Sequence, residues 1–314
     1  MRNYPMWLTL GILSGLLWGC NNYLYDMGTR YADIGAIPSD GILFPLVCTA
    51  INDMSAAVFL LMVHGCRGVL RSIETLFNRS GAFLCVAALL GGPLGQLSYC
   101  LGIFWTGPTY ALAISALYPV IGCILARIFL RQMMTLRMAI GIVLAVVGAI
   151  ITSFTPTESS ATLFFPGLIC ALFAAICWGS EIVLAVRGMK DIEPDLAITV
   201  RECISGTVLV LITLAVMPGA STLWKLSSAP MAFSTFVVAG AVAGGSYFLW
   251  YSVNRAIGCA RGMATNATYI IWGVLLQWGI ADVDVSGQVF FGCVLVFVGV
   301  LLVSLCPNER ESTS

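Results

Sequence analysis

The chain of 314 residues contains 59% hydrophobic residues, only 10% charged residues and a formal net charge of zero. Soluble domains carry about 25% charged residues, and the mean hydropathy here is +0.96, so the composition excludes an ordinary soluble protein. It predicts an all-α integral membrane protein, because a helix that crosses lipid satisfies its own backbone hydrogen bonds.

The sequence contains no recognisable motif for enzymatic catalysis. The twelve cysteines show neither a CxxC pair nor the spacing of a zinc site, and His64 is the only histidine, so we expect no metal site. P-loop, GxSxG and HExxH motifs are also absent from the sequence. We therefore expect a protein that is not an enzyme, with no catalytic residues, no cofactor and no nucleic-acid partner.

Apolar stretches of membrane-spanning length follow one another along the chain. A helix needs about 20 predominantly apolar residues to cross the hydrocarbon core of a bilayer. We predict ten transmembrane helices with short connections, at residues 6–26, 42–64, 81–104, 108–130, 135–154, 164–186, 196–217, 231–253, 260–281 and 286–306.

The basic residues predict the orientation of these helices. If the N-terminus is cytoplasmic, twelve Lys and Arg residues fall in inner segments and only Arg30 and Lys225 in outer ones, while Arg201 lies inside a span. An excess of basic residues on the cytoplasmic side is the usual pattern in membrane proteins. We therefore predict that both termini are cytoplasmic (N-in/C-in), in a multi-pass protein of a bacterial inner membrane.

The two halves of the chain carry similar features in the same order. Because each half has five predicted spans, an odd number, the second half must enter the membrane in the opposite orientation. Inverted repeats of this kind are typical of transporters, whose substrate site lies near the midplane between the halves. We predict two inverted five-helix repeats, residues 1–154 and 155–314. The matching features are Trp18-Gly19 with Trp178-Gly179, Asn52-Asp53 with Arg201-Glu202, Ser98-Tyr99 with Ser246-Tyr247, and Gly107 and Tyr118 with Gly258 and Tyr269.

Glu181 is the only charged residue in the predicted span 164–186. An ionisable group at membrane depth costs about 2.5–3.5 kcal/mol on insertion scales, so it marks a functional site by default. Trp178 stands one turn earlier on the same helix face, and an aromatic face beside an anion attracts an organic cation. The structural alternative is a helix–helix hydrogen bond made by a protonated Glu181.

Three further charged residues lie within predicted spans, namely Asp53, Arg201 and Glu202. Charges inside a membrane usually pair with one another. The favoured interpretation is therefore a structural ion pair between Arg201 and Glu202, with Asp53 as a further partner across the interface between the halves. The functional alternative is a gating or proton-coupling network.

Aromatic residues recur in the same spans as Glu181. A single Tyr or Trp usually serves packing or the interfacial belt. Matching aromatic residues in both halves, beside a carboxylate, favour instead a cage for an alkylated ammonium group. The candidates are Trp18, Tyr99, Tyr118, Trp178, Tyr247, Tyr251, Tyr269 and Trp272.

Glycine and proline residues are expected to interrupt two of the spans. The interruptions are predicted at Gly91-Gly92-Pro93 in the third span and at Tyr118-Pro119 in the fourth. An interrupted helix can supply backbone groups to a cavity, whereas small residues also allow helices to pack closely. Close packing is the favoured interpretation for most of these residues.

Seven short stretches carry these features, namely LLWG at Leu16–Gly19, GGPLGQ from Gly91, ISALYP at Ile114–Pro119, CWGSE at Cys177–Glu181, VRE at Val200–Glu202, SYFLWYSVNR at Ser246–Arg255 and NATYIIW at Asn266–Trp272. Together these motifs resemble those of the drug/metabolite transporter superfamily, with its EamA-like domains, and more specifically those of LicB-type bacterial choline transporters.

The resemblance implies an aromatic box walled by Trp18, Tyr118, Trp178, Tyr269 and Trp272, with Glu181 as its anionic partner and Tyr99, Tyr247 and Tyr251 as further candidates. The sequence departs from the family pattern at Asn52, where a histidine is expected, and at Glu202, where a glutamine is expected.

We therefore expect a secondary transporter that carries choline or a related quaternary ammonium by alternating access, with a small organic cation and the lipid bilayer as its partners. Protons are a candidate coupling ion, which Glu181 or Asp53 could carry. The first alternative is an exporter of amino acids or other small amphiphilic metabolites or drugs, which would stack on the same aromatic residues. A membrane-embedded enzyme or a scaffold is the second. The direction of transport and the oligomeric state stay open.

Overall fold

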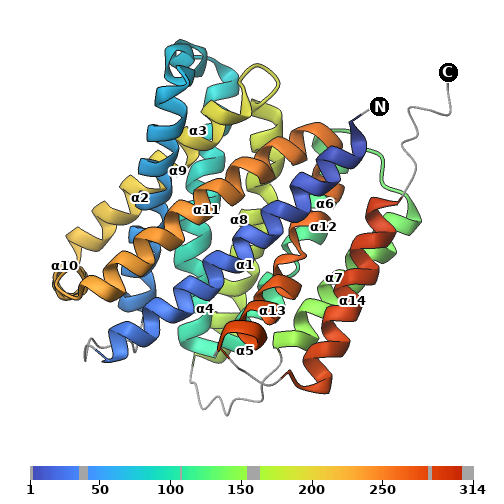
Figure 1. Cartoon of the computed structure of the whole chain (residues 1–314). Helices are drawn as coiled ribbons and strands as arrows, with labels where there is room; N and C mark the ends of the chain where they lie inside the picture. Colours follow the sequence, from blue (N-terminus) through green and yellow to red (C-terminus); the bar gives the residue numbers. More distant parts are fainter. Residues whose placement is uncertain (1–2, 35–41, 107, 154–162, 282–284, 306–314) are drawn as a thin grey trace.

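The computed structural model describes residues 3–34, 42–106, 108–153, 163–281 and 285–305. These residues form a bundle of helices and contain no strands (Figure 1). The predicted all-helical class is therefore confirmed for the described part of the chain. Six of its helical segments are long and apolar enough to cross a membrane, namely Leu43–Cys66, Arg79–Thr106, Phe164–Gly188, Pro194–Ala215, Pro230–Ile257 and Gly287–Ser304.

Each of the ten predicted ranges overlaps one helix or consecutive helices, and α1 extends eight residues beyond its predicted end at residue 26. The number of membrane crossings and their orientation stay predictions. Two elements were not predicted, η1 and α10, which lie in connections between predicted spans. The boundary between the two predicted repeats lies outside the described residues, as does Gly107.

The elements in chain order are α1 (Tyr4–Ile34), α2 (Leu43–Cys66), η1 (Val69–Leu76), α3 (Arg79–Leu89), η2 (Leu90–Leu94), α4 (Gly95–Thr106), α5 (Pro108–Ser115), α6 (Tyr118–Phe129), α7 (Leu136–Ser153), α8 (Phe164–Gly188), α9 (Pro194–Ala215), α10 (Met217–Ser227), α11 (Pro230–Ile257), α12 (Cys259–Asn266), α13 (Tyr269–Ala281) and α14 (Gly287–Ser304).

The fourth predicted span is broken where the sequence indicated. Helix α5 ends at Ser115 and α6 begins at Tyr118, because Pro119 has no backbone N–H to continue the ladder of hydrogen bonds. A similar break separates α12 from α13, immediately before Tyr269. There the Thr268 hydroxyl donates to the Thr265 carbonyl at 2.7 Å, a local bond of the kind that competes with the helix ladder.

The interruption expected at Gly91-Gly92-Pro93 is present as a π-helical turn between two α-helices and not as a break in the chain's helical path. The backbone continues from α3 through the π-helical turn η2 into α4 without leaving the helical path. A π-helical turn inserts an extra residue into the helix, so it can accommodate the missing N–H of Pro93. The third span is therefore widened at this point rather than broken.

The helices pack in pairs. Helix α1 packs along α11 and α13, α4 along α8, α2 along α9, and α7 along α14. Figure 1 shows α7 and α14 side by side at one edge of the bundle. Glycines allow the backbones of this pair to approach, since a Cβ atom on Gly148 would lie 2.6 Å from the Gly292 carbonyl oxygen.

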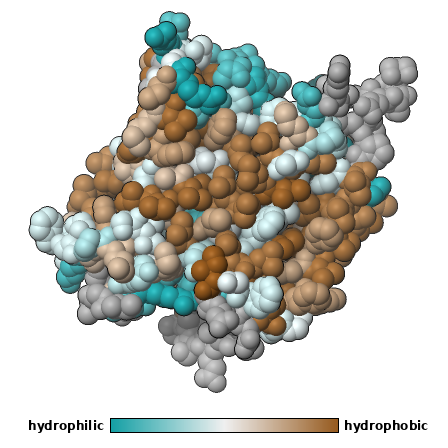
Figure 2. Space-filling model, viewed as in Figure 1, coloured by the Kyte–Doolittle hydropathy of each residue, from teal (hydrophilic) through white to brown (hydrophobic). Residues whose placement is uncertain are grey.

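The outer surface of the bundle is mainly apolar across the middle of the visible face. Hydrophobic residues cover the face formed by α1, α11, α7 and α14, and hydrophilic residues gather towards the two ends (Figure 2). Large exposed side chains on α14 include Phe290, Phe291 and Phe297. Such a surface is unfavourable in water and suits contact with lipid chains.

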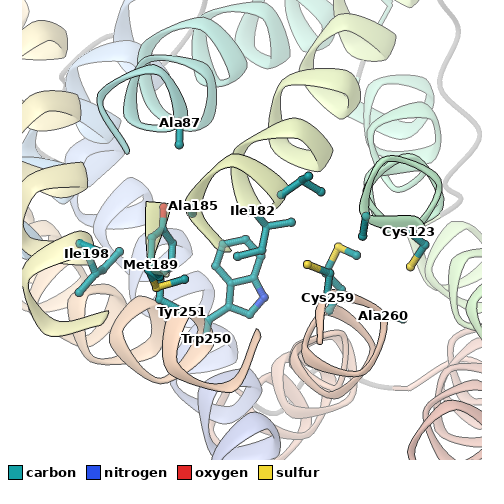
Figure 3. Packing of buried hydrophobic residues seen from close by; sticks show 14 of the residues in the cluster. Ala87, Cys123, Ile182, Ala185, Met189, Ile198, Trp250, Tyr251, Cys259 and Ala260 are labelled. Atoms are coloured by element: carbon teal, nitrogen blue, oxygen red, sulfur yellow. The ribbon is translucent and has the colours of Figure 1, made fainter. Parts of the chain in front are cut away.

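The main hydrophobic core lies where α6, α8, α9, α11 and α12 meet. Figure 3 shows the indole ring of Trp250 in the middle of this core, between Ile182 of α8 and Cys259 of α12. Ile182 directly follows Glu181, so the same packing that buries the core fixes the position of that carboxylate.

Candidate functional site

The Glu181 carboxylate lies inside the bundle and is paired. Its residue is 2% exposed, and Oε1 accepts a hydrogen bond of 2.8 Å from Arg201 Nε and another of 2.9 Å from the Tyr251 hydroxyl. Buried carboxylates are stable only when they are paired and hydrogen-bonded in this way. The predicted lone carboxylate therefore has a cation beside it that belongs to the chain itself.

Arg201 connects three carboxylates. Its Nη1 atom lies 2.7 Å from Glu202 Oε1 and 3.7 Å from Asp53 Oδ2. The contacts expected among Arg201, Glu202 and Asp53 are thus present, and Glu181 joins them. Asp53 also accepts a hydrogen bond of 2.5 Å from Ser205 Oγ. We call these four charged residues, Asp53, Glu181, Arg201 and Glu202, the charge cluster.

The π-helical turn η2 lies directly against the charge cluster. A Cβ atom on Gly91 would overlap the Glu181 carboxylate, and one on Gly92 would overlap the Ser205 side chain. The Gly91 carbonyl also accepts a hydrogen bond of 3.0 Å from Trp178 Nε1. The two glycines therefore bring the backbone of η2 into contact with α8 and α9, which is the close packing favoured for them in the sequence analysis.

The first group of predicted box residues surrounds Trp178. Its ring centroid lies 5.3 Å from that of Tyr99 and 6.4 Å from that of Tyr118, the latter in an edge-to-face arrangement. Residues from α4, α6 and α8 are thus brought together around Trp178.

The second group surrounds Tyr247. Its ring centroid lies 4.9 Å from that of Trp18, and the guanidinium carbon of Arg201 lies 4.7 Å from the same ring. Trp272 lies against α1, because a Cβ atom on Gly19, which follows Trp18, would lie 2.9 Å from the Trp272 Cβ atom. The ring contacts therefore place Tyr99, Tyr118 and Trp178 in one group and Trp18 and Tyr247 in another, and the second group contacts Arg201 of the charge cluster.

Trp250 is an aromatic neighbour that the sequence analysis missed. Its ring centroid lies 6.3 Å from that of Tyr247 and 5.8 Å from that of Tyr251. The signal was available, since Trp250 stands three residues after Tyr247 and so lies close to it on the surface of α11. Its Nε1 atom is buried and makes no hydrogen bond with any residue that the structure describes.

A polar network joins α1, α11 and α12 close to the second group. Ser14 Oγ donates to the Ser246 carbonyl at 3.0 Å, and Ser246 Oγ donates to the Ser14 carbonyl at 2.8 Å. Asn266 Nδ2 donates to Ser14 Oγ at 2.9 Å. Ser246 and Asn266 both belong to sequence stretches singled out above, whereas nothing in the sequence distinguished Ser14 from other small residues.

A cleft of about 500 Å³ lies towards the C-terminal end of α11, and none of the predicted box residues lines it. Its lining includes Trp7, Asp195 and Phe248. The ion pair between Arg255 and Glu193, with an N–O distance of 2.8 Å, belongs to the same lining. Phe248 follows Tyr247 directly, so the cleft approaches the second aromatic group. Among the residues that the structure describes, no group of three His, Cys, Asp or Glu side chains can hold a metal ion.

Replacing Tyr251 by phenylalanine should destabilise the protein by about 1.5–3 kcal/mol, the usual contribution of a hydrogen bond to a charged group. The change removes only the hydroxyl that donates to Glu181. The free energy of unfolding can be measured by titration with a denaturing detergent in mixed micelles. Tyr25→Phe is the matched control, since the Tyr25 hydroxyl makes a longer bond of 3.3 Å to a neutral carbonyl and should matter less. Equal losses in the two variants would contradict the prediction.

Comparison with known proteins identifies the family. The EamA-like transporter family matches residues 5–154 and 165–305. Protein LicB of Haemophilus influenzae is 24% identical over 99% of this chain and 100% of its own length. The uncharacterized transporter YyaM of Bacillus subtilis is 25% identical over 80% of this chain and 81% of its own.

Solved structures agree on the fold. A crystal structure matches with a TM-score of 0.70 at 16% sequence identity and covers 99% of both chains. Membership of a transporter family also agrees with the expectation that the chain is not an enzyme. The apolar helices and the two matched segments, which together cover nearly the whole chain, lead to one conclusion: the chain belongs to the EamA-like transporter family.

Proposed function

We propose that this protein is a secondary transporter that carries choline or a related quaternary ammonium across the inner membrane by alternating access. The observation that carries the proposal is the buried Glu181 carboxylate, which has one aromatic side chain a turn before it on the same helix and another in contact with it from a second helix. Trp178 precedes it by one turn on α8, and Tyr251 donates a hydrogen bond to it from α11.

A quaternary ammonium has no N–H group, so it cannot replace its water shell with hydrogen bonds. Faces of Trp and Tyr rings attract such a cation by about 0.5–2 kcal/mol each, depending on desolvation. One carboxylate supplies the opposite charge. The residues proposed to form the site are Trp18, Tyr118, Trp178, Glu181, Tyr269 and Trp272, with Tyr99, Tyr247 and Tyr251 around them.

We propose further that ten helices cross the membrane as two inverted repeats, residues 1–154 and 155–314. The helix pairing supports this, since α1 packs on α11 as α8 packs on α4. Close glycine contacts support it too. A Cβ on Gly19 would lie 3.1 Å from the Tyr269 carbonyl oxygen, and one on the matching Gly179 would lie 2.9 Å from that of Tyr118.

The proposed orientation places both termini in the cytoplasm. Tyr4 of α1 donates a hydrogen bond of 2.6 Å to the Ser304 carbonyl of α14, which supports a common side for the first and last helices. The cleft beside Arg255 and Glu193 would then approach the site from the cytoplasmic side. Asp53, Arg201 and Glu202 would form the gating and coupling network.

An inside-negative membrane potential would favour uptake of the cation by about 2.3 kcal/mol per charge per 100 mV. Protons are the proposed coupling ion, because carboxylates of the charge cluster can carry one across with the substrate. Choline flux into proteoliposomes should then rise when an inward proton gradient is imposed. Flux that is indifferent to the gradient would remove proton coupling and leave the potential as the driving force.

Choline binding to the purified protein tests the proposed substrate. The wild type should bind with a dissociation constant in roughly the micromolar range, and Glu181→Gln should weaken binding at least tenfold, or about 1.4 kcal/mol. Isothermal calorimetry measures both. Glu193→Gln is the matched control, because the Glu193 side chain is 78% exposed and pairs with Arg255. Binding of an aromatic amino acid without binding of choline would instead favour the exporter of amino acids or other amphiphilic metabolites.

A further inference from the structure

Arg201 already occupies the kind of position that a substrate cation would need. Its guanidinium carbon lies 4.7 Å from the Tyr247 ring centroid, within the roughly 6 Å over which a ring face attracts a cation. On its other side, Nε donates to Glu181 Oε1 at 2.8 Å. An aromatic face and a carboxylate are the same two groups that would bind a quaternary ammonium.

If the Arg201 guanidinium moved away from Glu181, it would still be paired with two other carboxylates. Nη1 also contacts Glu202 at 2.7 Å and Asp53 at 3.7 Å. Three carboxylates thus share one arginine, and the Arg201 side chain is only 3% exposed. Loss of every partner would leave a buried charge unpaired, which is strongly unfavourable, whereas loss of Glu181 alone would leave two partners in place.

Glu202 has room for a further hydrogen bond. Its residue is fully buried, and Oε2 makes no hydrogen bond with any residue that the structure describes. An unsatisfied buried acceptor is unfavourable by about 1–3 kcal/mol, and a guanidinium has five N–H donors in a planar fork. Glu202 Oε2 can therefore accept a hydrogen bond from the Arg201 N–H group that now bonds to Glu181. It lies on the same helix as Arg201.

We propose that Arg201 is a tethered competitor of the transported cation. In the empty site it pairs with Glu181, and when the substrate reaches Glu181 the guanidinium moves onto the free oxygen of Glu202. This inference rests on the proposed function above. It makes Arg201 a residue that sets affinity, because every substrate must displace it and the observed dissociation constant is raised accordingly. Glu181 is then paired with a cation in both states, with Arg201 in the empty site and with the substrate in the occupied site.

A charge-balanced variant tests the competition. Arg201→Gln/Glu202→Gln removes one positive and one negative charge, so the net charge of the cluster is unchanged. Without the competitor, this double variant should bind choline at least tenfold more tightly than the wild type in isothermal calorimetry. A purely structural role for Arg201 predicts equal or weaker binding, and that result would overturn the inference.

The single variant Glu202→Gln tests the same idea if the double variant does not fold. It keeps the shape of the side chain but removes the charge that receives the guanidinium, so Arg201 should stay on Glu181 and choline should bind several-fold more weakly. Binding equal to that of the wild type would contradict the inference. Absence of choline binding in the wild type and in both variants would instead contradict the proposed function itself.

Discussion

Replacing Gly91 by alanine is expected to destabilise the protein by more than about 3 kcal/mol and to abolish choline binding. The new Cβ atom would occupy the place of the Glu181 carboxylate. Overpacking a buried site alone costs about 1–3 kcal/mol. Because Glu181 is 2% exposed and bonded to Arg201, it can give way only by breaking a buried ion pair, which adds to the loss.

Gly279→Ala is the matched control for this experiment. It makes the same substitution in α13, where a Cβ atom would meet nothing within 4 Å, so the higher helix propensity of alanine should leave stability unchanged or raise it slightly. Unfolding by denaturing detergent and choline calorimetry on both variants provide the measurement. Normal stability of Gly91→Ala would mean that η2 does not press against Glu181.

The single substitution Arg201→Gln should also have a large effect, a loss of about 3–5 kcal/mol in the free energy of unfolding. It removes the only basic partner that the structure places beside Glu181, Glu202 and Asp53. Taking one partner from a buried ion pair leaves uncompensated buried charge, and this is the main source of the loss. The double variant with Glu202→Gln should recover part of it, because it restores the charge balance.

Arg255→Gln serves as the control for that loss. The Arg255 side chain is 32% exposed and that of its partner Glu193 is 78% exposed, and surface pairs contribute only about 0–1 kcal/mol. The two arginine variants should therefore differ several-fold in their effect on detergent unfolding. If Arg201→Gln were as mild as Arg255→Gln, the charge cluster would not hold the helices together.

The position of Glu181 inside the bundle could be predicted from the sequence, but its partners could not. A carboxylate in an apolar span is visible because the surrounding residues are uncharged. Its contacts, however, come from Arg201 on the next helix and Tyr251 on α11. Helical periodicity indicates which residues share a face, and it does not indicate which faces of different helices meet.

The ion pair between Arg201 and Glu202 was predicted from the sequence, but its geometry was not. Adjacent residues on a helix point about 100° apart and do not normally face each other. Here the long arginine side chain folds back far enough for Nη1 to lie 2.7 Å from Glu202 Oε1. Side-chain length and the positions of the other carboxylates decide this geometry, and neither appears in a pattern of residue types.

One packing signal was present in the sequence and was missed. Gly11, Gly15 and Gly19 recur every four residues on α1, so they lie on one face of the helix. A Cβ atom on Gly15 would lie 2.8 Å from the Asn266 carbonyl oxygen, which shows how closely α1 approaches α12. Small residues at this spacing are typical of helices packed within membranes.

During synthesis, α9 has to enter the lipid with Arg201 and Glu202 about two turns from its start. Each such charge opposes insertion of an isolated helix by about 2.5–3.5 kcal/mol. Helix α8 precedes α9 by only a short turn, so Glu181 is already part of the chain when Arg201 enters the lipid. The ion pair would then exist before α11 to α14 have been made. The ion pair that holds the finished protein together would thus first help α9 to enter the membrane.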